Sequence, residues 1–204
     1  MLDKTIPYSN ILMVCPYEKV KDMEPYTLPE GFQYVMADIT DTDNWSEIEF
    51  SVDEFDTLSD AKEYFKKYYL ADEDRLRQRC CFIMTDEGEY VATASAIMLP
   101  DMTGTYATLD WVAVKPEYQG RGLGKAIVSK ALSLYKNLAP GKDVLLHTQT
   151  WSHRAVKIYR SFGFCMTRTF KSEQHKNDYE KSLELLRLRL PGEIVDALEA
   201  ESVE

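Results

Sequence analysis

The stretch VAVKPEYQGRGLGKAIV, residues 112–128, joins a strand pattern to a helix pattern through a turn with three glycines. Before the turn, the run YATLDWVAV (106–114) is rich in the β-branched and aromatic residues that strands favour. After it, apolar residues recur at helical spacing over 123–138. The stretch therefore predicts a strand, a tight turn that carries Arg121 and Lys125, and a helix.

Two familiar glycine loops do not fit this spacing. A P-loop needs a glycine five residues before Gly124, where Gln119 stands, and a hydroxyl after the lysine, where Ala126 stands. A dinucleotide-binding loop needs a third glycine at the position of Lys125, and the next acid, Asp143, is poorly placed for a ribose. The spacing excludes the first loop and disfavours the second.

A third pattern, Q-x-x-G-x-G, is present directly after the strand. It resembles the central motif of the GNAT superfamily of acetyl-CoA-dependent N-acetyltransferases, V-x-P-x-x-[RQ]-G-x-G-x-[GA] followed by a helix. The residues that match are Val114, Pro116, Gln119, Gly120, Gly122 and Gly124.

A second block, WSHRAVKIYRSFGF (151–164), resembles a later motif of the same family. The matching pattern, A-x-x-x-Y-x-x-x-G-F, falls at Ala155, Tyr159, Gly163 and Phe164. Family members usually carry Asn three residues before that alanine, and here Ser152 stands in its place, where it can cap the helix. The resemblance covers roughly residues 80–170.

The resemblance implies an α/β fold with a mixed, mostly antiparallel central sheet, splayed between its fourth and fifth core strands and flanked by helices. The residue pattern itself predicts strands at 10–15, 31–38, 80–85, 89–99, 106–114, 142–150 and 164–170. It predicts helices at 41–52, 59–70, 122–138, 152–162, 179–190 and 193–200. Asp41 or Thr42 and Ser59 are the expected helix caps, Gly88 the tip of a hairpin, and 100–105 a loop.

The domain organisation follows from these elements. Residues 1–174 are expected to form one N-acetyltransferase domain, and 175–204 a helical appendage. In the appendage, one helix face carries the apolar residues Tyr179, Leu183, Leu186 and Leu190. That face predicts a helix that docks on the domain or mediates a homodimer.

Composition excludes several classes of protein. The chain has 204 residues and a net charge of −10, which disfavours nucleic-acid binding, and no apolar run approaches the ~20 residues that span a membrane. The start of the chain lacks a secretory signal, so a cytoplasmic protein is expected. Only one segment is basic: 111–170 holds ten Lys and Arg against Glu117 and Asp143, which suits contact with an anion.

Four cysteines occur, at positions 15, 80, 81 and 165, without metal-ligand spacing. They are expected to be buried free thiols, and no metal site is predicted. His153 and His175 are expected to lie at the surface.

Acetyl-CoA is the cosubstrate that the resemblance implies, and the turn explains how it is held. The first N–H groups of a helix lack partners and carry partial positive charge, so they can bind a diphosphate that no side chain obstructs. The phosphate cradle is expected at Gln119, Gly120, Arg121, Gly122, Leu123, Gly124 and Lys125. The main chain of Val112, Ala113 and Val114 would hold the pantetheine arm, with Ser152 as a further contact.

The catalytic residues are less strongly determined. By resemblance, Tyr159 is the general acid that protonates the departing sulfur. Some relatives use a strand glutamate as the base, but Thr108 stands at that position and cannot serve. Asp110, two residues further on, can take the proton directly or through water, or it can form a structural hydrogen bond. His147 on the next strand is the alternative proton carrier.

The acceptor is expected to be an amine of a small molecule or a peptide. Acids alternate with aromatic residues in the first predicted helix and after it: Glu47, Glu49, Asp53, Glu54 and Asp56 with Trp45, Phe50 and Phe55. This pattern suits a cationic amine, and it equally suits acidic helix faces turned to water. The alternatives to an enzyme are a catalytically inactive acyl-CoA-binding sensor or partner-binding module, and a nucleotide-binding regulator.

Overall fold

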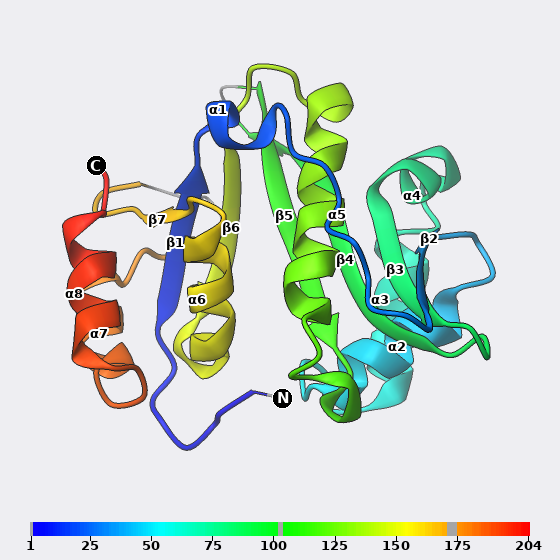
Figure 1. The fold of residues 1–204 in the computed structure, drawn as a ribbon, viewed down its shortest axis with the longest axis horizontal. Coiled ribbons are helices and arrows are strands. Elements are labelled where there is room, and N and C mark those ends of the chain that lie inside the picture. The colour runs from blue at the N-terminus through cyan, green and yellow to red at the C-terminus, as the bar shows by residue number, and fades with distance from the viewer. Residues whose placement is uncertain (1, 102–103, 171–174) are drawn as a thin grey trace. The chain divides into compact units, whose positions relative to one another are not determined.

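The computed structural model describes residues 2–101, 104–170 and 175–204 (Figure 1). Its strands are β1 (Asn10–Cys15), β2 (Phe32–Met36), β3 (Cys80–Thr85), β4 (Tyr90–Asp101), β5 (Gly104–Val114), β6 (Val144–Gln149) and β7 (Cys165–Met166). Its helices are α1 (Tyr17–Val20), α2 (Thr42–Ser51), α3 (Leu58–Tyr68), α4 (Glu73–Arg79), α5 (Leu123–Leu138), α6 (His153–Ser161), α7 (Tyr179–Leu186) and α8 (Gly192–Ala200). Within the described ranges, none of these helices has the length and apolar character needed to cross a bilayer.

The strands follow the order β2-β3-β4-β5-β6-β1-β7 in one mixed sheet. The pairs β2–β3, β3–β4, β1–β6 and β1–β7 are antiparallel, whereas β5 and β6 are parallel. In the described part of the chain, β5 pairs with β6 only at Ala107↔Val144 and Thr108↔Leu145. The mostly antiparallel, splayed α/β sheet predicted from the sequence is confirmed.

The contacts divide the chain into two units. The first unit comprises 22–97 and 109–138, and the second comprises 2–21, 98–108 and 139–204. Both β4 and β5 therefore contribute residues to each unit. The predicted boundary after residue 174 stays a prediction.

In the first unit, β3 is buried on both faces. Cys80 and Phe82 belong to a core cluster with Trp45 of α2 and Phe65 of α3. Because alternate residues of a strand face opposite sides, Cys81 and Ile83 face the other way, and β3 also contacts α5. The apolar run CCFI is unbroken because helices cover both sides of its strand.

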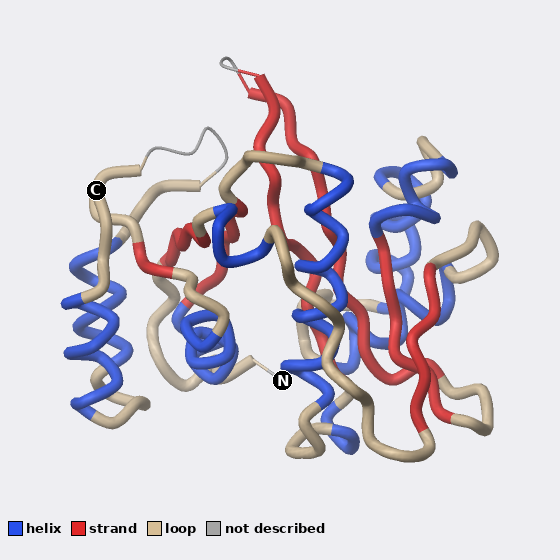
Figure 2. Tube along the Cα trace, turned by 45° about the horizontal axis from the view of Figure 1, so that its top comes forward, coloured by secondary structure: helices blue, strands red, loops and turns tan. Residues whose placement is uncertain are grey.

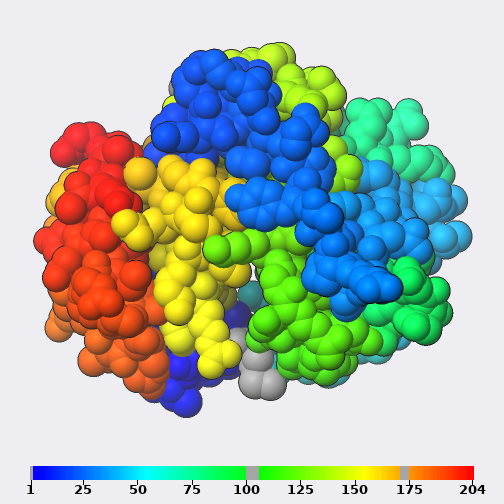
Figure 3. Space-filling view, viewed as in Figure 1, coloured from blue at the N-terminus to red at the C-terminus, as the bar shows by residue number. Residues whose placement is uncertain are grey.

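The segment before β2, together with Tyr34 of β2, holds α5 in place within the first unit. The Tyr26 N–H donates to Ser129 Oγ (2.8 Å), the Tyr34 hydroxyl donates to the carbonyl of Ala126 (3.1 Å), and Lys136 pairs with Glu24 (2.8 Å). In the space-filling view this segment, in blue, lies along the green helix (Figure 3). The start of α5 is therefore held by these hydrogen bonds as well as by its packing on the sheet.

In the second unit, α7 packs on β1 and α8 packs on β7, and Figure 2 shows the two helices side by side. Tyr179, Leu183 and Leu186 are all at most 5% exposed. The Ser182 hydroxyl donates to the carbonyl of Asn10 at 2.7 Å, which ties α7 to the start of β1. Helices α7 and α8 thus pack on strands of the second unit, and the expectation of an appendage that docks on the domain or mediates a homodimer stays a prediction.

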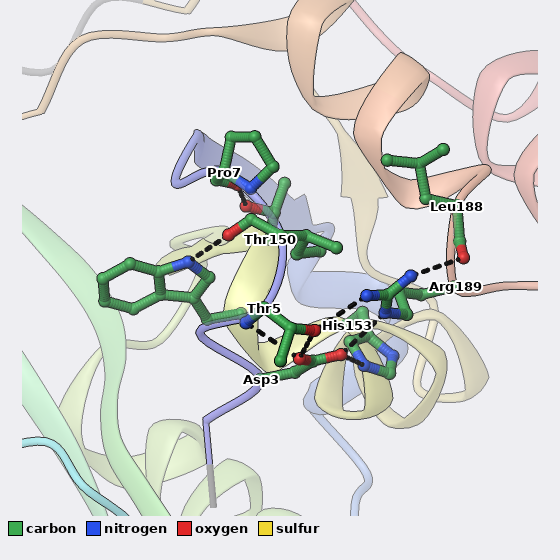
Figure 4. Close-up of polar contacts among 9 residues, drawn as sticks. Asp3, Thr5, Pro7, Thr150, His153, Leu188 and Arg189 are labelled. Atoms are coloured by element: carbon green, nitrogen blue, oxygen red, sulfur yellow. Dashed lines mark hydrogen bonds and ion pairs between the residues drawn. The ribbon is translucent and has the colours of Figure 1, made fainter.

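The N-terminal segment is also bound to the second unit (Figure 4). Asp3 accepts a hydrogen bond from Arg189 Nε (2.8 Å) and lies 3.3 Å from His153 Nε2. Arg189 also donates to Thr5 Oγ1 (2.7 Å), and Thr150 Oγ1 donates to the carbonyl of Pro7 (2.7 Å). The prediction that His153 lies at the surface is wrong, because His153 is only 8% exposed among these partners.

Some elements differ from the prediction. Helix α4 was not expected, and β7 covers two residues where 164–170 was expected. After β7, Thr167 instead forms an isolated parallel bridge with Val203. Of the expected loop at 100–105, the described residues belong to strands, because β4 reaches Asp101 and β5 begins at Gly104; residues 102–103 lie outside the described residues.

Candidate active site

The turn after β5 has two glycines that its backbone requires. Gly120 has φ +80° and Gly122 has φ +85°, a left-handed conformation that side chains rarely adopt. A Cβ built on either glycine would meet no atom within 4 Å. Space over the turn is therefore open, and its green surface is uncovered on the face seen in Figure 3.

Hydrogen bonds of both side-chain and main-chain groups stabilise this turn. Gln119 Nε2 donates to the carbonyl of Val114 (2.9 Å), and the Lys115 N–H donates to the carbonyl of Val91 on β4 (2.9 Å). Glu89 accepts from Lys115 Nζ (2.8 Å) and from the Tyr118 hydroxyl (2.6 Å). The side chain of Gln119 thus orders the turn, so its predicted contact with the cofactor would come from the main chain.

The first turn of α5 presents free donors and positive charge. The carbonyl of Gly122 accepts from the Ala126 N–H at 3.1 Å, which makes Gly122 the residue before the first helical turn. The N–H groups of the next three residues therefore have no partner within the helix, and the helix dipole makes this end partly positive. Arg121 lies against the ring of Tyr118 (5.0 Å), and Lys125 is exposed. This arrangement can hold an anion.

Strand β5 is kinked next to the turn. Trp111 has φ +49°, which is rare for so bulky a residue, and its N–H donates to Oδ1 of the preceding Asp110 (3.0 Å). Such a conformation costs about 1–3 kcal/mol and persists only where packing enforces it. The rings of Trp45, Phe55 and Tyr64 supply that packing.

The kink places a titratable group inside the first unit. Burial raises the pKa of Asp110 to about 6, partly offset by the hydrogen bond from Trp111 and reinforced by the charge of Glu54. A carboxylate with this pKa is mostly ionised at neutral pH and can still take a proton from an amine. A pKa near 6 suits a general base, and the catalytic role of Asp110 stays a prediction.

The other predicted site residues lie in the second unit. Tyr159 on α6 is 6% exposed, with its ring 6.0 Å from that of Phe164. Ser152 directly precedes α6, but its side chain makes no capping hydrogen bond, so the expected cap is wrong. The glycine turn, Val112–Val114 and Asp110 lie together in the first unit.

His147 is unsuited to carry a proton near neutral pH. Its ring stacks on that of His175 at 3.5 Å, and its Nε2 lies 2.9 Å from Asn10 Oδ1. Burial, and then the neighbouring His175, lower the pKa of His147 to about 4, so the ring is neutral at pH 7. His175, expected at the surface, is partly buried in this stack.

The cysteines offer no nucleophile. All four are free, as predicted, and three of them are buried; Cys165, which was also expected to be buried, is only partly buried. Burial raises the pKa of Cys15 and of Cys80 to about 12, so both thiols stay protonated at neutral pH.

The acidic residues of α2 and the segment after it divide into two groups. Glu47, Asp53, Glu54 and Asp56 are exposed, in line with acidic faces turned to water. Glu49 is the exception, because it is only 1% exposed. Sequence reasoning could have singled it out only by its position, one helical turn after Trp45.

The family model of the acetyltransferase (GNAT) family matches residues 39–164, which is more than half of the chain. The chain therefore belongs to the GNAT acetyltransferase family.

Solved structures with the same fold are distant in sequence. A GCN5-related N-acetyltransferase from Sphaerobacter thermophilus is 16% identical with a TM-score of 0.58, over 79% of this chain and 49% of its own. A tandem GNAT protein from the clavulanic acid biosynthesis pathway is 15% identical with a TM-score of 0.58, over 80% and 51%. A GNAT-family acetyltransferase from Colwellia psychrerythraea is 12% identical with a TM-score of 0.57, over 81% and 55%.

This chain thus spans about half the length of these structures. No curated protein matches its sequence.

Proposed function

We propose that the chain transfers the acetyl group of acetyl-CoA directly to an amine. The observation that carries the proposal is the turn at 119–125: two open glycines with left-handed φ, the free donors of α5, and Arg121 and Lys125 beside them. A diphosphate is the ligand that such a helix start suits. In the described part of the chain β5 pairs with β6 only up to Thr108, and a strand that is unpaired on this side suits an extended amide-containing arm.

The first unit would bind and orient the cosubstrate. The N–H groups of Leu123, Gly124 and Lys125 would bind the diphosphate, and the main chain of Val112–Val114 would bind the pantetheine arm. The Val114 carbonyl already accepts from Gln119, so the remaining main-chain groups of this stretch would carry that role. Acetyl-CoA would supply an activated thioester.

The transfer itself needs three proton movements. Asp110 would take a proton from the ammonium form of the acceptor, which leaves a neutral nitrogen to attack the thioester carbonyl. As the C–N bond forms and the C–S bond breaks, Tyr159 would give its hydroxyl proton to the departing sulfur, and the second proton that the nitrogen loses would restore the Tyr159 hydroxyl. No covalent intermediate with the protein is required.

The test is Tyr159→Phe, measured by thiol release at saturating acetyl-CoA and amine. We expect kcat to fall by about 10²-fold or more because general acids contribute about 10²–10⁴-fold. The affinity for CoA should stay the same. Tyr179→Phe is the matched control, since Tyr179 is a tyrosine in the same unit that is equally buried, and it should keep its kcat.

An unchanged kcat in Tyr159→Phe would remove this tyrosine as the acid. If acetyl-CoA binds tightly but a broad amine panel releases no thiol, the protein is an acyl-CoA sensor and the proposed enzyme is wrong.

A further inference from the structure

Two polar atoms on one face of α2 are buried without a partner. Among the described residues, neither Trp45 Nε1 nor Glu49 Oε1 has a hydrogen-bond partner, and both residues are at most 1% exposed. They stand four residues apart, which places them on the same side of the helix. Because native proteins pair nearly all buried polar atoms, an orphan donor and an orphan acceptor on one helix face mark a candidate contact for a ligand.

The rings around these atoms form an aromatic cluster of Trp45, Phe55, Tyr64 and Trp111. Trp45 lies 5.2–5.9 Å from the other three ring centroids, and Phe55 stacks on Trp111 at 5.4 Å. Trp45 is fully buried, whereas the other three are partly exposed. One edge of the cluster is therefore accessible to a ligand, and aromatic faces attract cations.

Two carboxylates stand at this cluster without an ion-pair partner among the described residues. Asp110 directly precedes Trp111, and neither Asp110 nor Glu49 forms an ion pair within the described part of the chain. Burial, together with repulsion from Glu54 and Asp110, raises the pKa of Glu49 well above its usual range. Burial is the largest cause that raises the pKa of Tyr64 to about 12, and the charges of Asp110 and Glu49 add to this increase. A bound cation would relieve the cost of ionising these carboxylates.

We infer that Glu49, Asp110 and the aromatic cluster form the acceptor site, and that the acceptor is an aliphatic amine with a second, protonated nitrogen, such as a short diamine or the end of a polyamine. This inference rests on the proposed function. In this inference Asp110 takes the proton of the reacting nitrogen, and Glu49 pairs with the second, charged nitrogen.

A second nitrogen follows from the chemistry of the transfer. The reacting nitrogen must lose its proton to Asp110 before it attacks, so it cannot remain the charged group that the site binds. A second ammonium group would stay charged, paired with Glu49 and lying against the rings, and the methylene chain between the nitrogens would cover apolar ring faces. Acceptors that carry carboxylates or phosphates near the amine would be repelled.

The experiment compares 1,4-diaminobutane with butylamine, which lacks the second nitrogen. Binding is measured by calorimetry and by tryptophan fluorescence, with and without CoA, in the wild type, in Glu49→Gln and in Glu47→Gln. We expect the wild type to bind the diamine at least about tenfold more tightly than butylamine, since a charge-assisted contact is worth about that factor or more. Glu49→Gln should remove this preference. Glu47→Gln, which changes an exposed acid of the same helix, should keep it.

Thermal unfolding of each variant checks that it is folded. If Glu49→Gln does not fold, Tyr64→Leu, which removes a partly exposed ring, should lower diamine affinity several-fold while butylamine binding changes little. Equal affinities for the two amines in the wild type would overturn the inference. So would equal loss of preference in Glu49→Gln and Glu47→Gln.

Thiol release then separates this inference from the proposed function. Efficient acetylation of butylamine without a preference for the diamine would leave the transferase in place and overturn the acceptor site. Selective diamine binding without release of CoA from acetyl-CoA would support the cation site and contradict the transferase.

Discussion

Asp110 makes the stability of the protein depend on pH. Its pKa rises from an ordinary value of 3.8 to about 6 in the folded chain, chiefly through burial. Between these values the folded protein keeps the proton and the unfolded chain loses it, so stability falls as pH rises from about 4 to 6. The titratable groups that interact with Asp110 are Glu49, Glu54, Tyr64, Tyr69 and Tyr135.

Asp110→Asn should therefore stabilise the protein at pH 7, by about 1–3 kcal/mol, because the uncharged amide avoids the cost of burying a charge. The gain should shrink toward zero at pH 4, where the wild-type carboxyl is protonated. Urea unfolding of both proteins from pH 4 to 7 measures it. Because the Asp110 charge also raises the pKa of Glu49, the difference between the curves measures Asp110 together with its coupling to Glu49, and a difference that does not change with pH would contradict the assignment.

Single residues were the hardest features to predict from the sequence. Asp110 was identified because an acid in an apolar strand is unusual. Glu49 was not distinguished from its exposed neighbours, although it is only 1% exposed, since burial depends on packing against other elements of the fold. His153 is buried by Asp3 and Arg189, which are distant from it in the chain. Periodicity within one element carries no information on such contacts.

Among the elements, the glycine turn gives the sharpest test. Gly122→Val should abolish the thermal stabilisation by CoA, because the side chain would stand over the free donors of α5. It should also cost about 1–2 kcal/mol of stability through its left-handed φ. Gly88→Val is the control: that glycine has φ +90° and equally open surroundings in the β3–β4 hairpin.

Gly88→Val should lose similar stability and keep the full response to CoA. If both valine variants respond to CoA as the wild type does, the phosphate cradle is wrong.

Most elements were predictable because their apolar residues repeat at the period of the element. Helix α3 was expected with Ser59 as its cap, but Thr57 accepts the N–H of Asp60 at 3.1 Å, since spacing fixes a helix start only to within about two residues. Helix α4 has one buried side chain, Leu76, and so no period to detect. The kink at Trp111 was missed because tertiary packing enforces it.

At the scale of the whole molecule, the C-terminal helices are part of the core of the second unit. Leu183→Ala should lower the free energy of unfolding by about 2–5 kcal/mol, because Leu183 is 5% exposed where α7 packs on β1. Leu188→Ala, at a position 59% exposed, should change it by less than about 0.5 kcal/mol. Equal effects in denaturant unfolding would show that α7 does not dock as described.

The last residues of the chain have one more consequence. β7 ends the strand order, and an edge strand presents unpaired N–H and C=O groups that a neighbouring molecule can capture. Here the Val203 N–H donates to the carbonyl of Met166 (2.9 Å), and the Val203 carbonyl accepts from the Arg168 N–H (2.8 Å). Val203 thus covers the edge of the sheet next to β7, which protects this edge against strand-to-strand aggregation at high concentration.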